Sequence, residues 1–181
     1  MRLDEYRTAR MLLRRMRLED FADLLRMYQD PVVMATLGGV RTAETTRRYL
    51  DLLISHWETH GFGWWTMRDP ATGRFIGRGG LRRMPVDGRE QVEVGYGLVS
   101  EYWGRGLATE LARECVGVAF AELQFPELVS FTLPTNLGSR RVMEKAGFRY
   151  DRDIVHADLP HVLYRQTATE WRQEHARHSP T

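Results

Sequence analysis

The residues with the clearest chemical potential lie between Trp103 and Ala108, directly before a segment that is apolar at three- and four-residue spacing. That spacing predicts a helix with one buried face. Small residues at a strand-to-helix turn let backbone N–H groups close around an anion at the helix N-terminus. We therefore interpret Gly104 and Gly106 as part of a pyrophosphate-binding turn, with an ordinary tight turn of positive φ as the alternative.

Two familiar nucleotide-binding motifs do not match this turn. A phosphate loop requires Lys followed by Ser or Thr directly after its last glycine, and the only lysine of the chain, Lys145, lies elsewhere. The dinucleotide fingerprint requires a third glycine, and Thr109 holds that position. Both motifs are therefore excluded.

The turn does resemble motif A of the GNAT family of N-acetyltransferases, which reads Gln/Arg-x-x-Gly-x-Gly/Ala. Gly106 and Ala108 hold its two small positions, whereas Trp103 replaces the Gln or Arg at its first position. Residues 102–110 and 10–20 also resemble the branch that contains the ribosomal-protein N-terminal acetyltransferases. The resemblance implies that this turn binds the pyrophosphate of acetyl-CoA through Trp103, Gly104, Arg105, Gly106, Leu107 and Ala108.

The segment before the turn, residues 91–99, alternates as a strand but contains two glycines, which weaken a strand unless another backbone or a ligand approaches closely. In the GNAT family this strand splays away from its parallel neighbour. The resemblance implies that the main chain of four residues pairs with the pantetheine arm and the thioester: Tyr96, Gly97, Leu98 and Val99. A twisted strand without a ligand is the alternative.

Residues 136–148 resemble motif B of the same family. Asn136 corresponds to its pantetheine-contacting asparagine and also fits a helix N-cap. Arg105 and Arg140 are candidates to face the phosphates of CoA, with solvated surface arginines as the alternative. The tyrosine that many members use to protonate the departing thiolate is replaced here by Met143, which leaves Ser139 as the candidate acid or as a support of the helix N-terminus.

Glu93 is the candidate general base, because an amine that attacks a thioester must lose a proton and a strand carboxylate can accept it directly or through water. Alternation places Glu93 and Tyr96 on opposite faces of the strand. An ordinary surface glutamate is the alternative. The acceptor side is expected to be lined by residues 32–43, by the region of Trp64 and by the loop at His156, although Trp64 also fits a core position.

Composition limits the remaining possibilities. The chain has 26 basic and 24 acidic residues, so its bulk charge does not indicate a nucleic-acid partner. Cys115, the only cysteine, excludes an internal disulfide and a cysteine-based metal cluster, and its position on the apolar helix face predicts a buried, inert thiol. Two isolated histidines, His156 and His161, do not make a metal site. No apolar run reaches membrane-spanning length, so we expect a cytoplasmic protein without a membrane partner.

Local patterns predict seven strands, with turn signals or helices between them. The strands are expected at 11–16, 63–68, 74–81, 91–99, 128–133, 149–155 and 162–167. Helices are expected at 19–30, 43–59, from 107 onward and at 136–147, with a loop at 32–42 and a polar tail at 168–181. A strand that is reached through a helix is most simply parallel to its predecessor, which applies to the strands on either side of the helix that begins at 107.

The resemblance covers residues 8–167 of a single domain, 1–181. It implies a mixed α/β (α+β) GNAT fold: a mostly antiparallel sheet of six to seven strands, flanked by helices, with one parallel pair splayed around the cofactor. The implied activity is direct transfer of an acetyl group from acetyl-CoA to a primary amine, either a peptide N-terminus or a small amine, in a ternary complex without metal. The alternative is a catalytically weak or inactive CoA-binding module, and a homodimer is left open.

Overall fold

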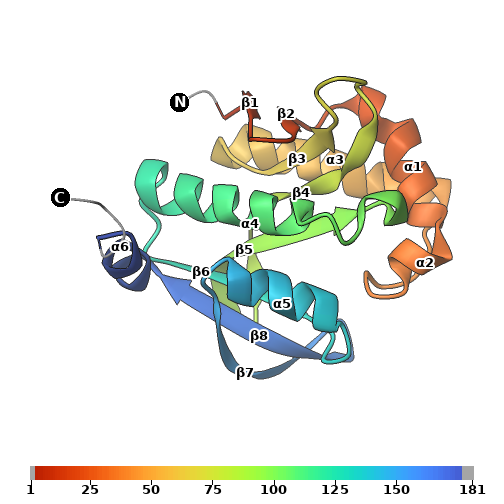
Figure 1. The fold of residues 1–181 in the computed structure, drawn as a ribbon. Helices are drawn as coiled ribbons and strands as arrows, with labels where there is room; N and C mark the ends of the chain where they lie inside the picture. Colours follow the sequence, from red (N-terminus) through yellow and green to blue (C-terminus); the bar gives the residue numbers. More distant parts are fainter. Residues whose placement is uncertain (1–2, 177–181) are drawn as a thin grey trace.

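A computed structural model describes residues 3–176, which form one eight-stranded sheet flanked by helices (Figure 1). The strand order is β1-β2-β3-β4-β5-β6-β8-β7, and β5 and β6 are the one parallel pair. The strands are β1 (Glu5–Arg7), β2 (Leu12–Arg15), β3 (Trp64–Arg68), β4 (Phe75–Val86), β5 (Arg89–Leu98), β6 (Glu127–Thr132), β7 (Arg149–His156) and β8 (Leu159–Thr167). This confirms the predicted mixed, mostly antiparallel sheet.

Two features of the sheet differ from the sequence prediction. The eighth strand, β1, has three residues at the sheet edge, too few for an alternating pattern to reveal it. Strand β4 extends to Val86 instead of ending near residue 81, because its hairpin with β5 closes only at Asp87 and Gly88, both with positive φ. Two such residues are typical of a two-residue hairpin turn. Pro85 therefore lies inside a strand and not in a turn.

The helices follow the predicted order with two additions, α2 and α6. They are α1 (Phe21–Gln29), α2 (Pro31–Met34), α3 (Ala43–His60), α4 (Leu107–Gly117), α5 (Leu137–Lys145) and α6 (Ala168–Ala176), and a π-helical turn (Val118–Glu122) continues α4. The short helix α2 replaces the first part of the predicted loop at 32–42. It forms because Pro31 occupies its first position while the Asp30 side chain accepts hydrogen bonds from the next two N–H groups.

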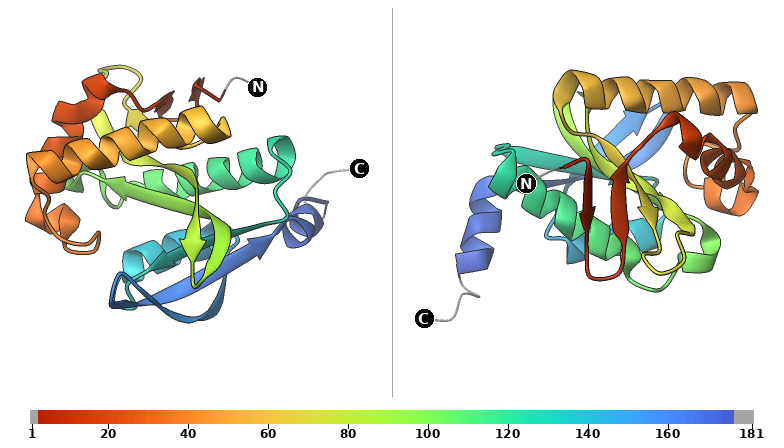
Figure 2. Two further views of the ribbon diagram at one scale, coloured as in Figure 1. Left: turned by 180° about the vertical axis from the view of Figure 1, so that it is seen from behind. Right: turned by 90° about the horizontal axis from the view of Figure 1, so that it is seen from above.

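The helices cover both faces of the sheet (Figure 2). Helices α4 and α5 lie side by side on one face, where the α4 residues Leu111 and Cys115 pack into the larger apolar cluster. Helices α1 and α3 lie on the opposite face, with Leu24 and Leu50 in a second cluster. Within the described residues, no helix is both long and apolar enough to cross a membrane.

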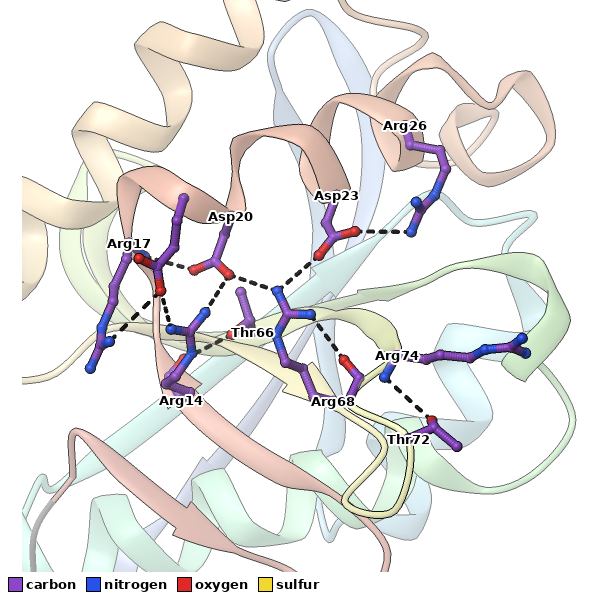
Figure 3. Close-up of polar contacts among 11 residues, drawn as sticks. Arg14, Arg17, Asp20, Asp23, Arg26, Thr66, Arg68, Thr72 and Arg74 are labelled. Atoms are coloured by element: carbon purple, nitrogen blue, oxygen red, sulfur yellow. Dashed lines mark hydrogen bonds and ion pairs between the residues drawn. The ribbon is translucent and has the colours of Figure 1, made fainter.

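A buried carboxylate attaches α1 to strands β2 and β3 (Figure 3). Asp20 is fully buried and accepts hydrogen bonds from Arg14 on β2 at 2.6 Å and from Arg68 on β3 at 2.8 Å. Its second oxygen accepts the backbone N–H of Arg17, and Arg68 also reaches Asp23 on α1 at 2.8 Å. This network fixes the start of α1 over the edge of the sheet.

The centre of the sheet contains an incomplete pairing between β5 and β6. The two strands pair in parallel at one position, where Glu93 lies opposite Val129. Beside it, the Ser130 hydroxyl donates to the Val94 carbonyl at 2.8 Å. Strand β5 then continues to Leu98 while β6 follows β8. The two strands therefore separate beyond Glu93, and helices α4 and α5 both begin shortly after the separated ends.

Candidate active site

The turn before α4 has the geometry of an anion-binding cradle. Gly104 and Gly106 have φ values of 72° and 77°, which side chains with a Cβ rarely adopt. Gly106 is the N-cap and supplies no side-chain acceptor, and the first backbone bond of the helix is from the Glu110 N–H to Gly106. The N–H groups of residues 107–109 are therefore the ones an anion would bind. The geometry of the turn therefore suits an anion such as a pyrophosphate, and binding of acetyl-CoA by these residues stays a prediction.

Two residues near the N-terminus, Thr8 and Arg10, hold this turn in place through hydrogen bonds that no sequence motif predicts. Arg10 donates to the Arg105 carbonyl at 2.7 Å and to Glu110 at 2.7 Å, while the Thr8 hydroxyl donates to Glu110 at 2.5 Å. Burial alone would raise the pKa of Glu110, but the hydrogen bonds from Thr8 and Arg10 lower it below its usual value. A carboxylate in the first turn of a helix gives no signal that it pairs with residues about a hundred positions away.

Trp103 connects the turn to the end of β5. Its indole N–H donates to the Leu98 carbonyl at 2.8 Å, while about half of the residue stays exposed. The Arg105 guanidinium lies 5.2 Å from the Tyr102 ring centre. Trp103 therefore fixes the backbone at the end of the strand that precedes the turn.

Residues predicted from motif B meet Tyr96 at the start of α5. Asn136 is the N-cap, and its side chain accepts the Ser139 N–H at 3.2 Å, as predicted. The Tyr96 hydroxyl lies 3.0 Å from Ser139 Oγ and 3.1 Å from the Ser139 carbonyl. Burial raises the pKa of Tyr96 well above its usual range, against the opposing hydrogen bond with Ser139. Met143, in contrast, is fully buried in the core.

Arg140 has partners within the protein. Its guanidinium donates to the Tyr164 hydroxyl and to the Pro134 carbonyl, both at 3.2 Å. The side chain is therefore attached to β8 and to the β6–α5 connection. Contact of Arg140 with CoA phosphates stays a prediction.

Glu93 lies on the α3 face of β5, opposite to Tyr96, as alternation predicts. Its Oε2 accepts hydrogen bonds from Arg82 at 2.9 and 3.2 Å, and Arg82 also donates to the Tyr49 hydroxyl at 3.0 Å. Glu93 Oε1 accepts no hydrogen bond from residues 3–176 and lies 3.3 Å from the position that a Cβ on Gly95 would occupy. The buried carboxylate thus has one oxygen held and one oxygen free beside the separated part of β5.

The two predicted acceptor-side residues lie on this same face. Trp64 covers Gly95 so closely that a Cβ there would be 2.5 Å from its ring. His156 contacts the Phe131 ring at 4.7 Å. Burial, with the nearby His161, lowers the pKa of His156, and the charge of Glu93 acts in the opposite direction. Trp64 therefore lies beside the free oxygen of Glu93, and His156 lies close enough to feel the charge of Glu93.

Other candidate chemistry is weaker. Cys115 is fully buried, and burial raises the pKa of its thiol, which confirms the expected buried position. No group of three or more His, Cys, Asp or Glu residues within 3–176 could hold a metal ion. The site therefore consists of the turn before α4, the separated strand β5 and polar groups on both faces of that strand.

Comparison with known proteins identifies the family to which the chain belongs. A family model described as an acetyltransferase (GNAT) domain matches residues 10–149. The chain belongs to the GNAT acetyltransferase family. It is therefore an acetyl-CoA-dependent N-acetyltransferase, with acetyl-CoA as the donor and an amine as the acceptor.

The chain is also similar to individual proteins. The chain is 32% identical over 158 residues to the uncharacterized protein YkkB of Bacillus subtilis, an alignment that covers 87% of this chain and 92% of YkkB. An acetyltransferase structure from Agrobacterium tumefaciens is 28% identical, with a TM-score of 0.80 over 90% of this chain and 93% of that one. A ribosomal-protein-S5-alanine acetyltransferase from Vibrio fischeri shares the fold at 17% identity, with a TM-score of 0.75 over 92% and 98% of the two chains.

Proposed function

We propose that the enzyme transfers the acetyl group directly to a primary amine while acetyl-CoA and the acceptor are bound together. The observation that carries this proposal is the placement of two proton-handling groups on opposite faces of β5. The free oxygen of Glu93 lies on the α3 face, and the Tyr96 hydroxyl lies on the α5 face. Between them runs the main chain that β6 does not pair.

In this mechanism Glu93 accepts a proton from the attacking amine, directly or through water. Arg82 fixes the orientation of the carboxylate through Oε2, so that Oε1 remains available. A main-chain N–H of the separated segment, residues 95–98, would stabilise the oxyanion that forms when the amine attacks. The three groups therefore act differently, since Glu93 removes a proton, Arg82 orients Glu93, and the backbone binds the developing negative charge.

The departing thiolate must regain a proton, and the Tyr96–Ser139 hydroxyl pair is placed to supply it on the other face of the strand. Burial raises the pKa of Tyr96, which leaves its hydroxyl protonated at neutral pH but also makes it a weaker acid, so the transfer relies on its position beside the thiolate and not on its acidity. This pair takes the part that relatives with a tyrosine at the position of Met143 give to that residue. Ser139 is then the bridge between Tyr96 and the N-terminus of α5.

The acceptor is a peptide N-terminus or a small amine. The shared fold with a ribosomal-protein-S5-alanine acetyltransferase supports a peptide, and the enclosed, aromatic surroundings of Glu93 support a small amine. In either case we place the acceptor on the α3 face, near Trp64 and His156.

Thiol release from acetyl-CoA, measured against a panel of peptides and small amines, tests the proposal. We expect amine-dependent release in the wild-type enzyme. Gly106→Val should lose donor binding, because a β-branched residue is strained at a φ of 77°. Gly117→Ala is the matched control, because an added Cβ there meets no atom within 4 Å and the residue lies in the helical region. Equal acetyl-CoA affinity in the Gly106→Val enzyme would contradict the site, and thiol release that no amine increases would contradict the transfer.

A further inference from the structure

Within residues 3–176, Arg78 is a buried cation without a carboxylate partner. It lies on β4, opposite Gly97 of β5, and is 3% exposed. Its Nε donates to the Tyr28 hydroxyl at 3.0 Å, and the remaining four of its five N–H bonds have no acceptor among residues 3–176. Unlike the Trp64 indole nitrogen, the two Nη atoms of Arg78 are not fully enclosed, so water reaches them and an anion could replace that water.

A second unpaired donor lies beside Arg78. The Trp64 indole N–H is enclosed and has no hydrogen-bond partner within residues 3–176, and the Arg78 guanidinium carbon is 4.4 Å from the Trp64 ring centre. Buried polar groups are rarely left without a partner. Two neighbouring donors without acceptors therefore point to a ligand that brings oxygen atoms.

Arg41 adds a further positive charge to the same aromatic cluster. Its guanidinium carbon lies 4.7 Å from the Tyr28 ring centre and 4.3 Å from that of Tyr49, and no ion pair involves it within residues 3–176. Arg82 is the third arginine of this group, and its charge is balanced by Glu93. Three arginines thus face one carboxylate, and the excess charge attracts an anion.

The free donors lie next to the position where the amine must react. Arg78 Nη1 is 3.0 Å from the position of a Cβ on Gly97, and Glu93 Oε1 is 3.3 Å from the position of a Cβ on Gly95. These two glycines are neighbours on one face of β5, about 7 Å apart. The Gly97 position is also 2.9 Å from Met27 Cε and 3.0 Å from Leu37 Cδ1, so a small molecule with its ammonium at Glu93 would bring its anion to Arg78 by displacing these flexible side chains.

This anion is distinct from the phosphates of the donor. The turn before α4 is the cradle that fits the pyrophosphate, and α4 packs on the other face of the sheet. Arg78 lies on the face covered by α1 and α3, in contact with Tyr28 of α1. The anion therefore belongs to the acceptor.

We propose that Arg78, with support from Arg41, binds a carboxylate of the acceptor, so that the substrate is a small amino carboxylate. This inference rests on the proposed function, since it identifies the acceptor of the same transfer. Guanidinium groups bind carboxylates through paired, charge-assisted hydrogen bonds. The reaction converts the amine into an N-acetyl amide, while the carboxylate keeps its charge and takes no part in bond changes.

The test compares acids with their carboxamides as acceptors: glycine, β-alanine and γ-aminobutyrate, each against its amide, in the thiol-release assay. We expect each effective acid to exceed its amide in kcat/KM by about 10- to 100-fold, because a hydrogen-bonded charge is lost. A carboxamide has the more acidic ammonium group and so supplies more free amine at a given pH. The comparison is therefore biased against the expected result.

Variants then assign the preference to residues. Arg78→Met should abolish it while acetyl-CoA affinity holds, and Arg78→Lys should keep part of it. Arg41→Met, at a half-buried position, should reduce it and serves as the second variant where Arg78→Met does not fold. Arg172→Met, on α6, removes the same charge at an exposed position and should preserve the preference.

Three results would overturn the inference: equal use of acids and amides, an acid preference that Arg78→Met leaves intact, or no turnover of any amino carboxylate. If simple amines or amides are acetylated in these cases, the proposed function stands and only the carboxylate subsite fails. If no amine of any kind supports thiol release, both fail. A lower acetyl-CoA affinity in Arg78→Met with an unchanged acid preference would assign Arg78 to the donor instead.

Discussion

Replacing Glu93 with Gln separates its proposed catalytic role from its structural one. The substitution keeps the shape of the side chain and removes its basicity. If Glu93 is the general base, turnover at neutral pH should fall by roughly 10²- to 10⁴-fold. Acetyl-CoA affinity should hold, because the turn at residues 103–108 is unchanged.

The structure also predicts a cost in stability. Breaking one partner of a fully buried ion pair costs about 3–5 kcal/mol. Here the side chain of Arg82 is 21% exposed and keeps its bond to Tyr49, so we expect a smaller loss, about 2 kcal/mol. For a chain of this length, that corresponds to a fall in Tm of roughly 4–8 °C. Calorimetry and steady-state kinetics at a temperature well below the transition measure the two effects separately.

The pH profile decides between the roles. More acceptor amine is neutral at high pH, so the defect of Glu93→Gln should shrink as pH rises. Arg82→Gln is the matched variant, because it breaks the same ion pair and leaves the carboxylate in place. Near-wild-type turnover of Glu93→Gln across the pH range would refute the reasoning, and the oxyanion site and substrate positioning would then remain as the main source of rate.

Three further predictions concern other parts of the molecule. Tyr96→Phe should lower kcat by about 10²-fold or more without changing the KM for acetyl-CoA, as steady-state kinetics would show. Asp20→Asn should cost about 2–3 kcal/mol in denaturant unfolding, because two arginines lose a fully buried carboxylate but are partly exposed and keep Glu19 and Asp23 as partners. Burial, chiefly, lowers the pKa of His56 from 6.5 to about 4, and its Nε2 accepts the Arg83 N–H in the folded state. Because His56 binds a proton more tightly in the unfolded chain, its contribution to the free energy of unfolding is complete above pH 6.5 and is lost as pH falls toward 4. Unfolding measured at several pH values should show this decline in the wild-type protein. The same decline should be missing in His56→Gln.

Local patterns were sufficient for those parts of the fold whose signals lie close together in the sequence. Helix α5 begins after Asn136 and ends before Gly147, which has a φ of 96°, as its capping residues predict. The glycine turn before α4 was also placed correctly. Edge strand β1 and helix α2 were missed, because three or four residues are too few to show a period.

The candidate site was predictable only in part, for a physical reason. Glu93 and Ser139 belong to short patterns, and the structure places both beside the separated segment of β5. The partners that define their chemistry, Arg82 and the Tyr96 hydroxyl, come from strand register and helix packing. Arg78 gave no sequence signal at all, because an arginine in a strand is unremarkable until the nearby carboxylate of Glu93 is seen to pair with Arg82.

The single ladder pair between β5 and β6 has a consequence for the order in which substrates bind. The molecule is made of two half-sheets, β1–β5 and β6–β8, that meet at Glu93 and Val129. Acetyl-CoA bound in the gap between the separated ends of β5 and β6 would contact both half-sheets. Amide hydrogen exchange should therefore slow in β5 and β6 together when acetyl-CoA is added. At a donor concentration of 100 times Kd, mass action alone adds about 2.7 kcal/mol to stability. We expect this enzyme to bind acetyl-CoA before the acceptor, because the bound donor fills the gap between β5 and β6 and so completes the site that the acceptor enters.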